Sequence, residues 1–215
     1  MVQAATRLLL IRHAHVDNGE DRQRMCGWLD LPLSCTGELQ LRRFRPEPSP
    51  IKPQVVYASS SSRARVTAEA LAVSFGVPVS IDPQLREINC GAFEGISIQE
   101  LKDRYPELWT RNALQDNSDF AWPNGETYRN FRYRVFNALS RIARRHANTR
   151  IPVVTHTGVI SQVVGATKGL SPAVWEPYRP EPFTATEVIW SGGAPLHLLS
   201  FNVADWWRGL PLHAE

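Results

Sequence analysis

Residues 7–13 read Arg-Leu-Leu-Leu-Ile-Arg-His, a short apolar run that ends in two polar side chains, Arg12 and His13. An unbroken apolar run is typical of a strand that is buried on both faces of its sheet, as the strands of parallel sheets are. The run therefore predicts the first strand of a parallel sheet. In such sheets ligands bind at the carboxyl ends of the strands, which is where Arg12 and His13 stand.

Apolar runs and helical patterns alternate along the rest of the chain. Further strands are expected over residues 55–57, 77–81 and 151–155, with a closing pair over 187–190 and 196–201 joined by Gly192 and Gly193. Helices are expected over residues 34–44, with Ser34 or Thr36 as N-cap, from 59–62 to 75, over 127–146 and over 158–166, with punctuated helical sequence over 96–119. This alternation predicts an α/β fold, a three-layer α/β/α sandwich with a mainly parallel central sheet. We expect residues 1–215 to form a single domain.

The composition narrows the class of protein. The chain has 215 residues, of which 43% are hydrophobic, and a formal net charge of +3, which is too small to indicate a nucleic-acid-binding protein. No apolar run approaches the roughly 18 residues needed to cross a membrane, and no signal peptide is recognisable. Its three cysteines have neither paired nor metal-type spacing, which is typical of reduced thiols. We expect a cytoplasmic protein that binds neither membrane nor nucleic acid.

Polar side chains at three predicted strand ends give the first functional indication. Arg12 and His13 follow one strand, residues 59–63 follow another, and Thr155-His156-Thr157 end a third. Neutral imidazole is a competent nucleophile that forms covalent intermediates. A neighbouring guanidinium disfavours protonation of the imidazole, and it also binds the anionic phosphate that the imidazole attacks.

Phosphoryl transfer depends mainly on positioning and on stabilisation of charge. Arg12, Arg63 and His156 are candidate donors to the phosphoryl oxygens. An acid is also needed to protonate the departing alcohol. Glu87 is the first candidate for that acid because of its strand-to-loop context, and Glu94 is the second.

Five separated segments resemble the histidine phosphatase superfamily, which includes the cofactor-dependent phosphoglycerate mutases. They occur in the order typical of that family and span residues 7 to about 165. The segments are Arg12-His13-Ala14, the loop and helix start from Gly27 to Gly37, Arg63-Ala64 with Thr67-Ala68, Leu85-Arg86-Glu87 with Gly91 and Glu94-Gly95, and residues 155–159, Thr-His-Thr-Gly-Val. The resemblance implies the phosphoglycerate mutase-like fold with a small helical cap insertion over about 96–124.

The resemblance also implies roles for individual residues. His13 would accept the phosphoryl group, and Glu87 would act as general acid and then as general base. The phosphate pocket and substrate contacts would comprise Arg12, Arg63 and His156, with Asn18, Gly27, Glu87 and Thr157. Gly125-Glu126-Thr127 and Arg134 fit the family's pattern at the start of its long helix, where a structural role is expected. The implied activity is a metal-independent phosphatase that uses no cofactor and acts on a small phosphorylated substrate.

The sequence departs from the family's pattern next to the nucleophile. Ala14 replaces the usual Gly, His15 replaces the usual Glu, and Asn18 follows His13 by one residue fewer than is common. Alanine is small, so a tight turn survives if its φ is negative.

Three other interpretations stay open. His13, His15 and Asp17 have metal-ligand side chains at alternating positions, and His146, His156 and His197 would complete a metallohydrolase site. The same phosphohistidine would serve a phosphoglycerate mutase, although dedicated mutases are generally longer. A non-catalytic module that binds phosphorylated ligands is the third.

The sequence does not identify the substrate. Trp109, Arg111, Trp122 and Tyr128 are candidates to line the pocket beneath the cap, although aromatic residues at helical spacing more often form a core. We expect Trp206 and Trp207 to pack the final segment or to form a contact between the copies of a homodimer.

Overall fold

The computed structural model describes residues 5–18, 24–45, 53–191 and 193–207. Within these residues the strands form one six-stranded sheet in the order β3-β2-β4-β1-β5-β6. The strands are β1 (Thr6–Arg12), β2 (Val56–Ala58), β3 (Val79–Ile81), β4 (Arg150–Thr155), β5 (Ala185–Ser191) and β6 (Ala194–Val203). Strands β1 to β4 run parallel to one another, β5 runs antiparallel to them, and β6, which is antiparallel to β5, runs in the direction of the first four. The sheet is therefore mixed and mainly parallel, as expected.

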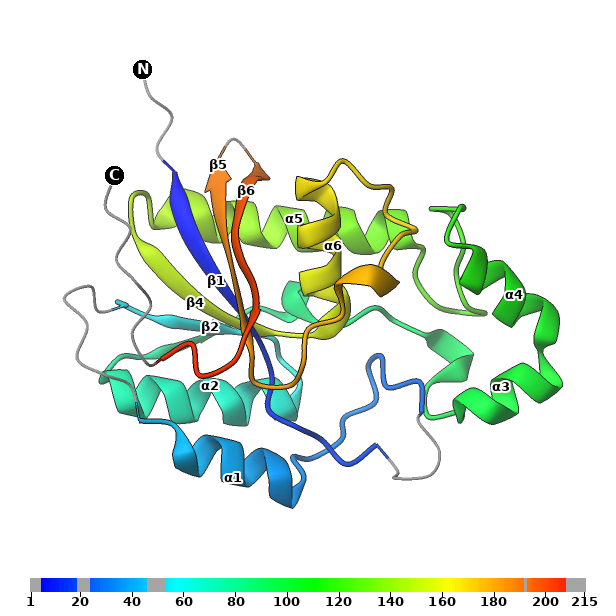
Figure 1. The fold of residues 1–215 in the computed structure, drawn as a ribbon, viewed down its shortest axis with the longest axis horizontal. Coiled ribbons are helices and arrows are strands. Elements are labelled where there is room, and N and C mark those ends of the chain that lie inside the picture. The colour runs from blue at the N-terminus through cyan, green and yellow to red at the C-terminus, as the bar shows by residue number, and fades with distance from the viewer. Residues whose placement is uncertain (1–4, 19–23, 46–52, 192, 208–215) are drawn as a thin grey trace.

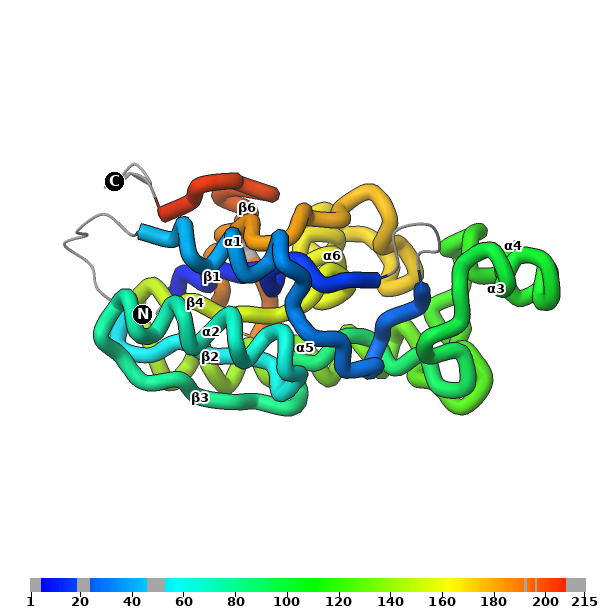
Figure 2. Tube along the Cα trace, turned by 90° about the horizontal axis from the view of Figure 1, so that it is seen from below, coloured from blue at the N-terminus to red at the C-terminus, as the bar shows by residue number. Residues whose placement is uncertain are grey.

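Helices cover both faces of this sheet, with α1 and α2 on one side and α5 and α6 on the other (Figures 1 and 2). The α-helices are α1 (Cys35–Arg43), α2 (Ser62–Phe75), α3 (Ile98–Arg104), α4 (Pro106–Leu114), α5 (Tyr128–Arg145) and α6 (Thr157–Thr167). Three short 3₁₀ helices are η1 (Pro83–Leu85), η2 (Gly91–Phe93) and η3 (Glu176–Tyr178). The three-layer α/β/α arrangement is the predicted one. No helix among the described residues is long and apolar enough to cross a membrane.

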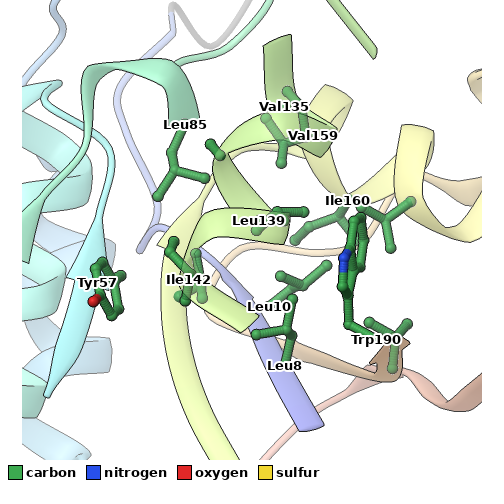
Figure 3. Packing of buried hydrophobic residues seen from close by; sticks show 14 of the residues in the cluster. Leu8, Leu10, Tyr57, Leu85, Val135, Leu139, Ile142, Val159, Ile160 and Trp190 are labelled. Carbon is green, nitrogen blue, oxygen red and sulfur yellow. The ribbon is translucent and has the colours of Figure 1, made fainter. Parts of the chain in front are cut away.

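The apolar run of β1 lies at the centre of both layers of core. Leu8 and Leu10 point to one face, where they join a buried cluster with side chains of α5 and α6 (Figure 3). Leu9 and Ile11 point to the other face and join a second cluster with α2. Because side chains of a strand alternate between faces, only an unbroken apolar run supplies both cores.

Local hydrogen bonds explain where the observed elements begin. Ser34 is the N-cap of α1 because its hydroxyl accepts from the Gly37 N–H, so the alternative cap, Thr36, is wrong. Thr127 caps α5 in the same way. The third strand begins at Val79 and not at residue 77, because α2 ends in a left-handed Gly76 and the Val77 N–H bonds back to Ala72 O. The expected β5–β6 turn contains Gly193, whereas Gly192 lies outside the described residues.

The predicted cap segment contains α3 and α4, which extend beyond one end of the sheet (Figure 1). Trp122 and Tyr128 are buried in an aromatic cluster with Phe93 and Phe120. These two pocket candidates therefore belong to the core of this segment. The other two lie nearer the surface, Trp109 half-buried beneath the Lys102 ammonium and Arg111 exposed.

The chain's final described segment packs against α1. Trp206 is buried against Phe44 and Phe183, and Trp207 contacts the same two rings. The expectation that this pair packs the end of the chain is confirmed.

Candidate active site

The carboxyl ends of β1, β2 and β4 meet at one edge of the sheet. Arg12 pairs with Thr155, and Ala58 pairs with Val154. The His13 N–H then bonds to Thr155 O at 3.0 Å. This register brings together the three polar strand ends that the sequence singled out: residues 12–13, 59–63 and 155–157.

His13 is held in one orientation, with Nδ1 facing a carbonyl oxygen and Nε2 accepting a hydrogen bond from Arg63 Nε. Its side chain is buried, with Nδ1 2.7 Å from the carbonyl oxygen of Ala14. Only a protonated Nδ1 can donate to that carbonyl, so the neutral ring has its lone pair on Nε2. Arg63 Nε lies 3.2 Å from Nε2, and the His156 ring meets the His13 ring edge-on with centroids 5.2 Å apart.

The site disfavours the protonated form of both of its histidines. Burial lowers the pKa of His13 well below its ordinary 6.5, and the charges of Arg63 and Arg12 lower it further. Burial and the same charges also lower the pKa of His156 well below 6.5. A neutral His13 is the form that can attack phosphorus.

Acid is therefore expected to destabilise the fold through these two side chains. Below pH 6.5 the histidines of the unfolded chain bind protons that the folded site does not, so the free energy of unfolding falls as the pH falls. The loss is up to about 1.4 kcal/mol per histidine for each pH unit, until the folded pKa is reached. Chemical denaturation between pH 7.5 and 5 measures it. His13→Gln should remove about half of the dependence due to the pair, and an unchanged slope in His13→Gln and His156→Gln would contradict the assignment.

Arg63 connects His13 to the loop that follows residue 24. Its guanidinium is 2% exposed and donates to Leu29 O at 2.7 Å and to Gly27 O at 2.9 Å. Asp30 in the same loop accepts from the N–H and the hydroxyl of Ser62, both at 2.8 Å. The start of α2 is thus capped by this distant carboxylate, whereas Ser61 in the N-cap position makes no side-chain capping bond. The N-cap position thus lies within residues 59–62, as predicted, but the side-chain capping bond comes from Asp30.

Two nitrogen atoms of the site are buried and have no partner among the described residues. They are Nε of Arg12, whose Nη1 donates to Pro180 O, and Nδ1 of His156, whose Nε2 lies 2.8 Å from Ser59 Oγ. An unpaired buried polar group is costly, and such exceptions are characteristic of ligand sites. A phosphoryl group offers the oxygen acceptors that both atoms lack.

The side chain of Glu87 reaches the N-terminus of α6 from the segment between η1 and η2. Its carboxylate accepts from the Gly158 N–H at 2.9 Å and from its neighbour Ile88 N–H at 2.8 Å. A Cβ on Gly158 would stand 2.1 Å from Glu87 Oε1, so the glycine makes room for the carboxylate. Glu94, the second candidate acid, accepts N–H bonds from Trp28, Leu29 and Cys90. These three hydrogen bonds join the loop around residues 28–29 to the segment that begins at Cys90, which is a structural role.

A family model described as histidine phosphatase superfamily (branch 1) matches residues 8–203. The chain belongs to this superfamily. It is 28% identical over 164 residues to a probable phosphoglycerate mutase, GpmB, of Escherichia fergusonii, covering 76% of this chain and 75% of that protein. It is 30% identical over 152 residues to phosphoserine phosphatase 1 of Hydrogenobacter thermophilus, covering 70% of this chain and 71% of that protein. The solved structure of Bacillus stearothermophilus YhfR superposes with a TM-score of 0.81 at 26% identity, covering 94% of this chain and all of that one.

Similarity thus extends both to proteins named as phosphatases and to proteins named as probable mutases.

The first residue at which this chain departs from the family pattern, Ala14, fits its position without backbone strain. Ala14 has a negative φ, is fully buried in the core, and its N–H bonds to Thr67 Oγ1 at 3.1 Å. The condition on which the tight turn depended is met.

The second departure, His15, turns toward α1. Its exposed ring lies 2.8 Å from Ser34 Oγ, and its N–H donates to Gln40 Oε1. The other histidines of the metallohydrolase interpretation are spread out. The His146 ring lies 2.9 Å from the Tyr57 hydroxyl, and the His146 carbonyl accepts from the Thr6 hydroxyl at the start of β1, the end opposite to His13. His197 lies on β6. In the described part of the chain, no three His, Cys, Asp or Glu side chains are grouped as metal ligands.

The remaining substrate-binding candidates are Asn18, Gly27 and Thr157, each of which makes a hydrogen bond to another group of the protein. Asn18 donates to Arg24 O at 3.0 Å, and its Oδ1 is buried without a hydrogen-bond partner in the residues described. Gly27 contributes its carbonyl to Arg63, and a side chain there would collide with Glu94. Thr157 is the first residue of α6 and its carbonyl accepts from Ser161.

Sequence reasoning pointed to residues 59–63, Glu126 and Arg134 but did not predict which side chains they contact. Ser59 and Ser61 both contact His156 Nε2. Arg134 and Glu126 lie behind Glu87, about forty residues away in the sequence. For this pair the family pattern around residues 125–134 was the only signal.

Proposed function

We propose that this protein is a phosphomonoester hydrolase that acts through a phosphohistidine at His13 on a small phosphorylated metabolite. The observation that carries the proposal is His13 itself. Its Nδ1 is hydrogen-bonded to Ala14 O, while its Nε2 faces the guanidinium of Arg63 in a buried, positively charged site.

The proposed reaction has two displacements. Arg12, Arg63 and His156 bind the phosphoryl oxygens, and His13 Nε2 attacks phosphorus while the ester oxygen leaves with a proton from Glu87. Water then attacks the phosphohistidine. Glu87, now a carboxylate, accepts the proton of this water, and inorganic phosphate and neutral His13 are released. Every step uses side chains of this chain and needs no metal ion.

The acceptor of the phosphoryl group distinguishes a phosphatase from a mutase. We propose water as the acceptor, so that each turnover releases inorganic phosphate. In the same proposal residues 1–215 form one domain, with residues 96–124 as the cap over the site. The similarity to a protein named phosphoserine phosphatase supports hydrolysis.

The test is release of inorganic phosphate from a panel of phosphomonoesters in the presence of excess chelator. We expect turnover of at least one alkyl phosphate, with a rate that the chelator leaves unchanged. Activity that chelation abolishes and zinc restores would support the metallohydrolase interpretation.

A second assay uses 3-phosphoglycerate with its bisphosphate primer. Rapid isomerisation without phosphate release would show a mutase. Binding of phosphorylated compounds with no turnover of any of them would leave the non-catalytic module as the function.

A further inference from the structure

Glu87 stands on an irregular segment between η1 and η2, so no helix or strand fixes its direction. Arg134, from the middle of α5, holds this segment instead. Its Nη1 donates to Gln84 O at 2.7 Å and to Arg86 O at 3.0 Å, and its Nη2 donates to Glu87 O at 3.1 Å. One planar guanidinium thereby binds three backbone carbonyls within residues 84–87, next to the proposed acid.

Glu126 fixes Arg134 in turn. Its carboxylate lies 2.5 Å from Nη2 of Arg134 and 3.2 Å from Nε. Its Oε1 also accepts from the Asn89 N–H at 2.9 Å, and its own N–H bonds to Asn89 O at 3.1 Å. The side chains of the ion pair are only 14% and 17% exposed, so solvent screens them little. Arg134 and Glu126 together therefore bind the backbone on both sides of Glu87, within residues 84–89.

The opposite side of Glu87 is shaped by the start of α6. The Gly158 N–H binds the carboxylate, and the Phe131 ring lies beside the same glycine. The Arg134 guanidinium packs over this ring at 5.1 Å from its centroid. Backbone and carboxylate of Glu87 are thus held from two helices, α5 and α6.

We propose that Arg134 and Glu126 are positioning residues that direct the Glu87 carboxyl group at the oxygen of the leaving alcohol. The inference rests on the proposed function of the site. Arg134 reaches Glu87 only through the backbone, so it acts on the proton transfer and not on the phosphate. A misplacement of about 1 Å is enough to cost on the order of 100-fold in rate.

Leaving groups of different basicity separate this role from a merely structural one. An alkoxide needs a proton as it departs, whereas p-nitrophenolate leaves without one. The quantity to compare is kcat/KM, because it covers only the steps up to departure of the alcohol and excludes hydrolysis of the phosphohistidine. Arg134→Met should lower kcat/KM for an alkyl phosphate by about 10- to 100-fold and for p-nitrophenyl phosphate by less than about 3-fold.

Two conservative variants keep the test informative if Arg134→Met does not fold. Arg134→Lys keeps the charge but loses the fork of donors, and Glu126→Gln keeps the shape but loses the ion pair. In both variants kcat/KM for the alkyl phosphate should fall more than kcat/KM for p-nitrophenyl phosphate, but by a smaller factor than in Arg134→Met. Arg141→Met is the matched control: it removes an ion pair to Asp82 from the same helix, and its ratio of the two kcat/KM values should equal that of the wild type.

A double-mutant cycle with Glu87→Gln completes the experiment. Once the acid is absent, Arg134→Met should cause little further loss with the alkyl phosphate. Equal losses with both substrates, or full additivity with Glu87→Gln, would overturn the positioning role while the wild type stays active. A wild type without His13-dependent turnover of either substrate would overturn the proposed function, and this inference with it.

Discussion

His13→Ala is expected to lower phosphate release from every phosphomonoester by at least about 1,000-fold, because the covalent route through the enzyme is lost. The arginines and His156 would still bind the phosphoryl group, but no side chain would accept it. The measurement is released phosphate under saturating substrate. Wild-type enzyme quenched during turnover should also carry an acid-labile phosphoryl group that the variant lacks.

His15→Ala is the matched control for this prediction. His15 is two residues further on, its ring is exposed, and it bonds to Ser34 at the start of α1. We expect its loss to change kcat/KM by less than about 3-fold, as for a surface substitution. Comparable losses in the two variants would instead favour the interpretation in which both histidines bind a metal ion.

Glu87→Gln is expected to make the reaction depend on the leaving group. The amide oxygen can still accept from the Gly158 N–H, so the geometry is kept while the transferable proton is lost. For an alkyl phosphate kcat/KM should fall by about 100- to 10,000-fold, the range typical of general acids. For p-nitrophenyl phosphate the first step should be nearly unaffected.

The second half of the reaction gives an independent readout of the same variant. Without a base, water attacks the phosphohistidine slowly, so p-nitrophenol should appear in a burst of one equivalent followed by a slow steady state. Glu94→Gln is the comparison, since Glu94 accepts three backbone N–H bonds and its loss should lower stability. A uniform loss on all substrates without a burst in Glu87→Gln would contradict the role of Glu87.

The sequence predicts the sheet well where one segment carries its own signal. The run that became β1 has no polar residue between Arg7 and Arg12, so its burial on both faces could be inferred without its neighbours. The third strand begins two residues later than its apolar pattern predicts, because the Val77 N–H closes the end of α2. The apolar pattern of residues 77–81 does not show that the Val77 N–H bonds to the end of α2 and not to a neighbouring strand.

Side chains that act at a distance were the least predictable part of the site. His13 and His156 could be inferred because each follows an apolar run directly. Asp30 caps a helix that begins 32 residues later, and Arg134 binds carbonyls 47 to 50 residues before it. Such contacts are set by the packed fold and leave no local pattern, so only the structure reveals them.

The pairing of β1 with β4 has a consequence for how the protein acquires its function. Arg12 and Thr155 are neighbours across the sheet, yet most of the chain separates them. Contacts between such distant segments close large loops and form slowly during folding. The proposed nucleophile His13 and its proposed phosphate pocket are assembled only after this closure, so recovery of activity in a refolding experiment should report completion of the central sheet.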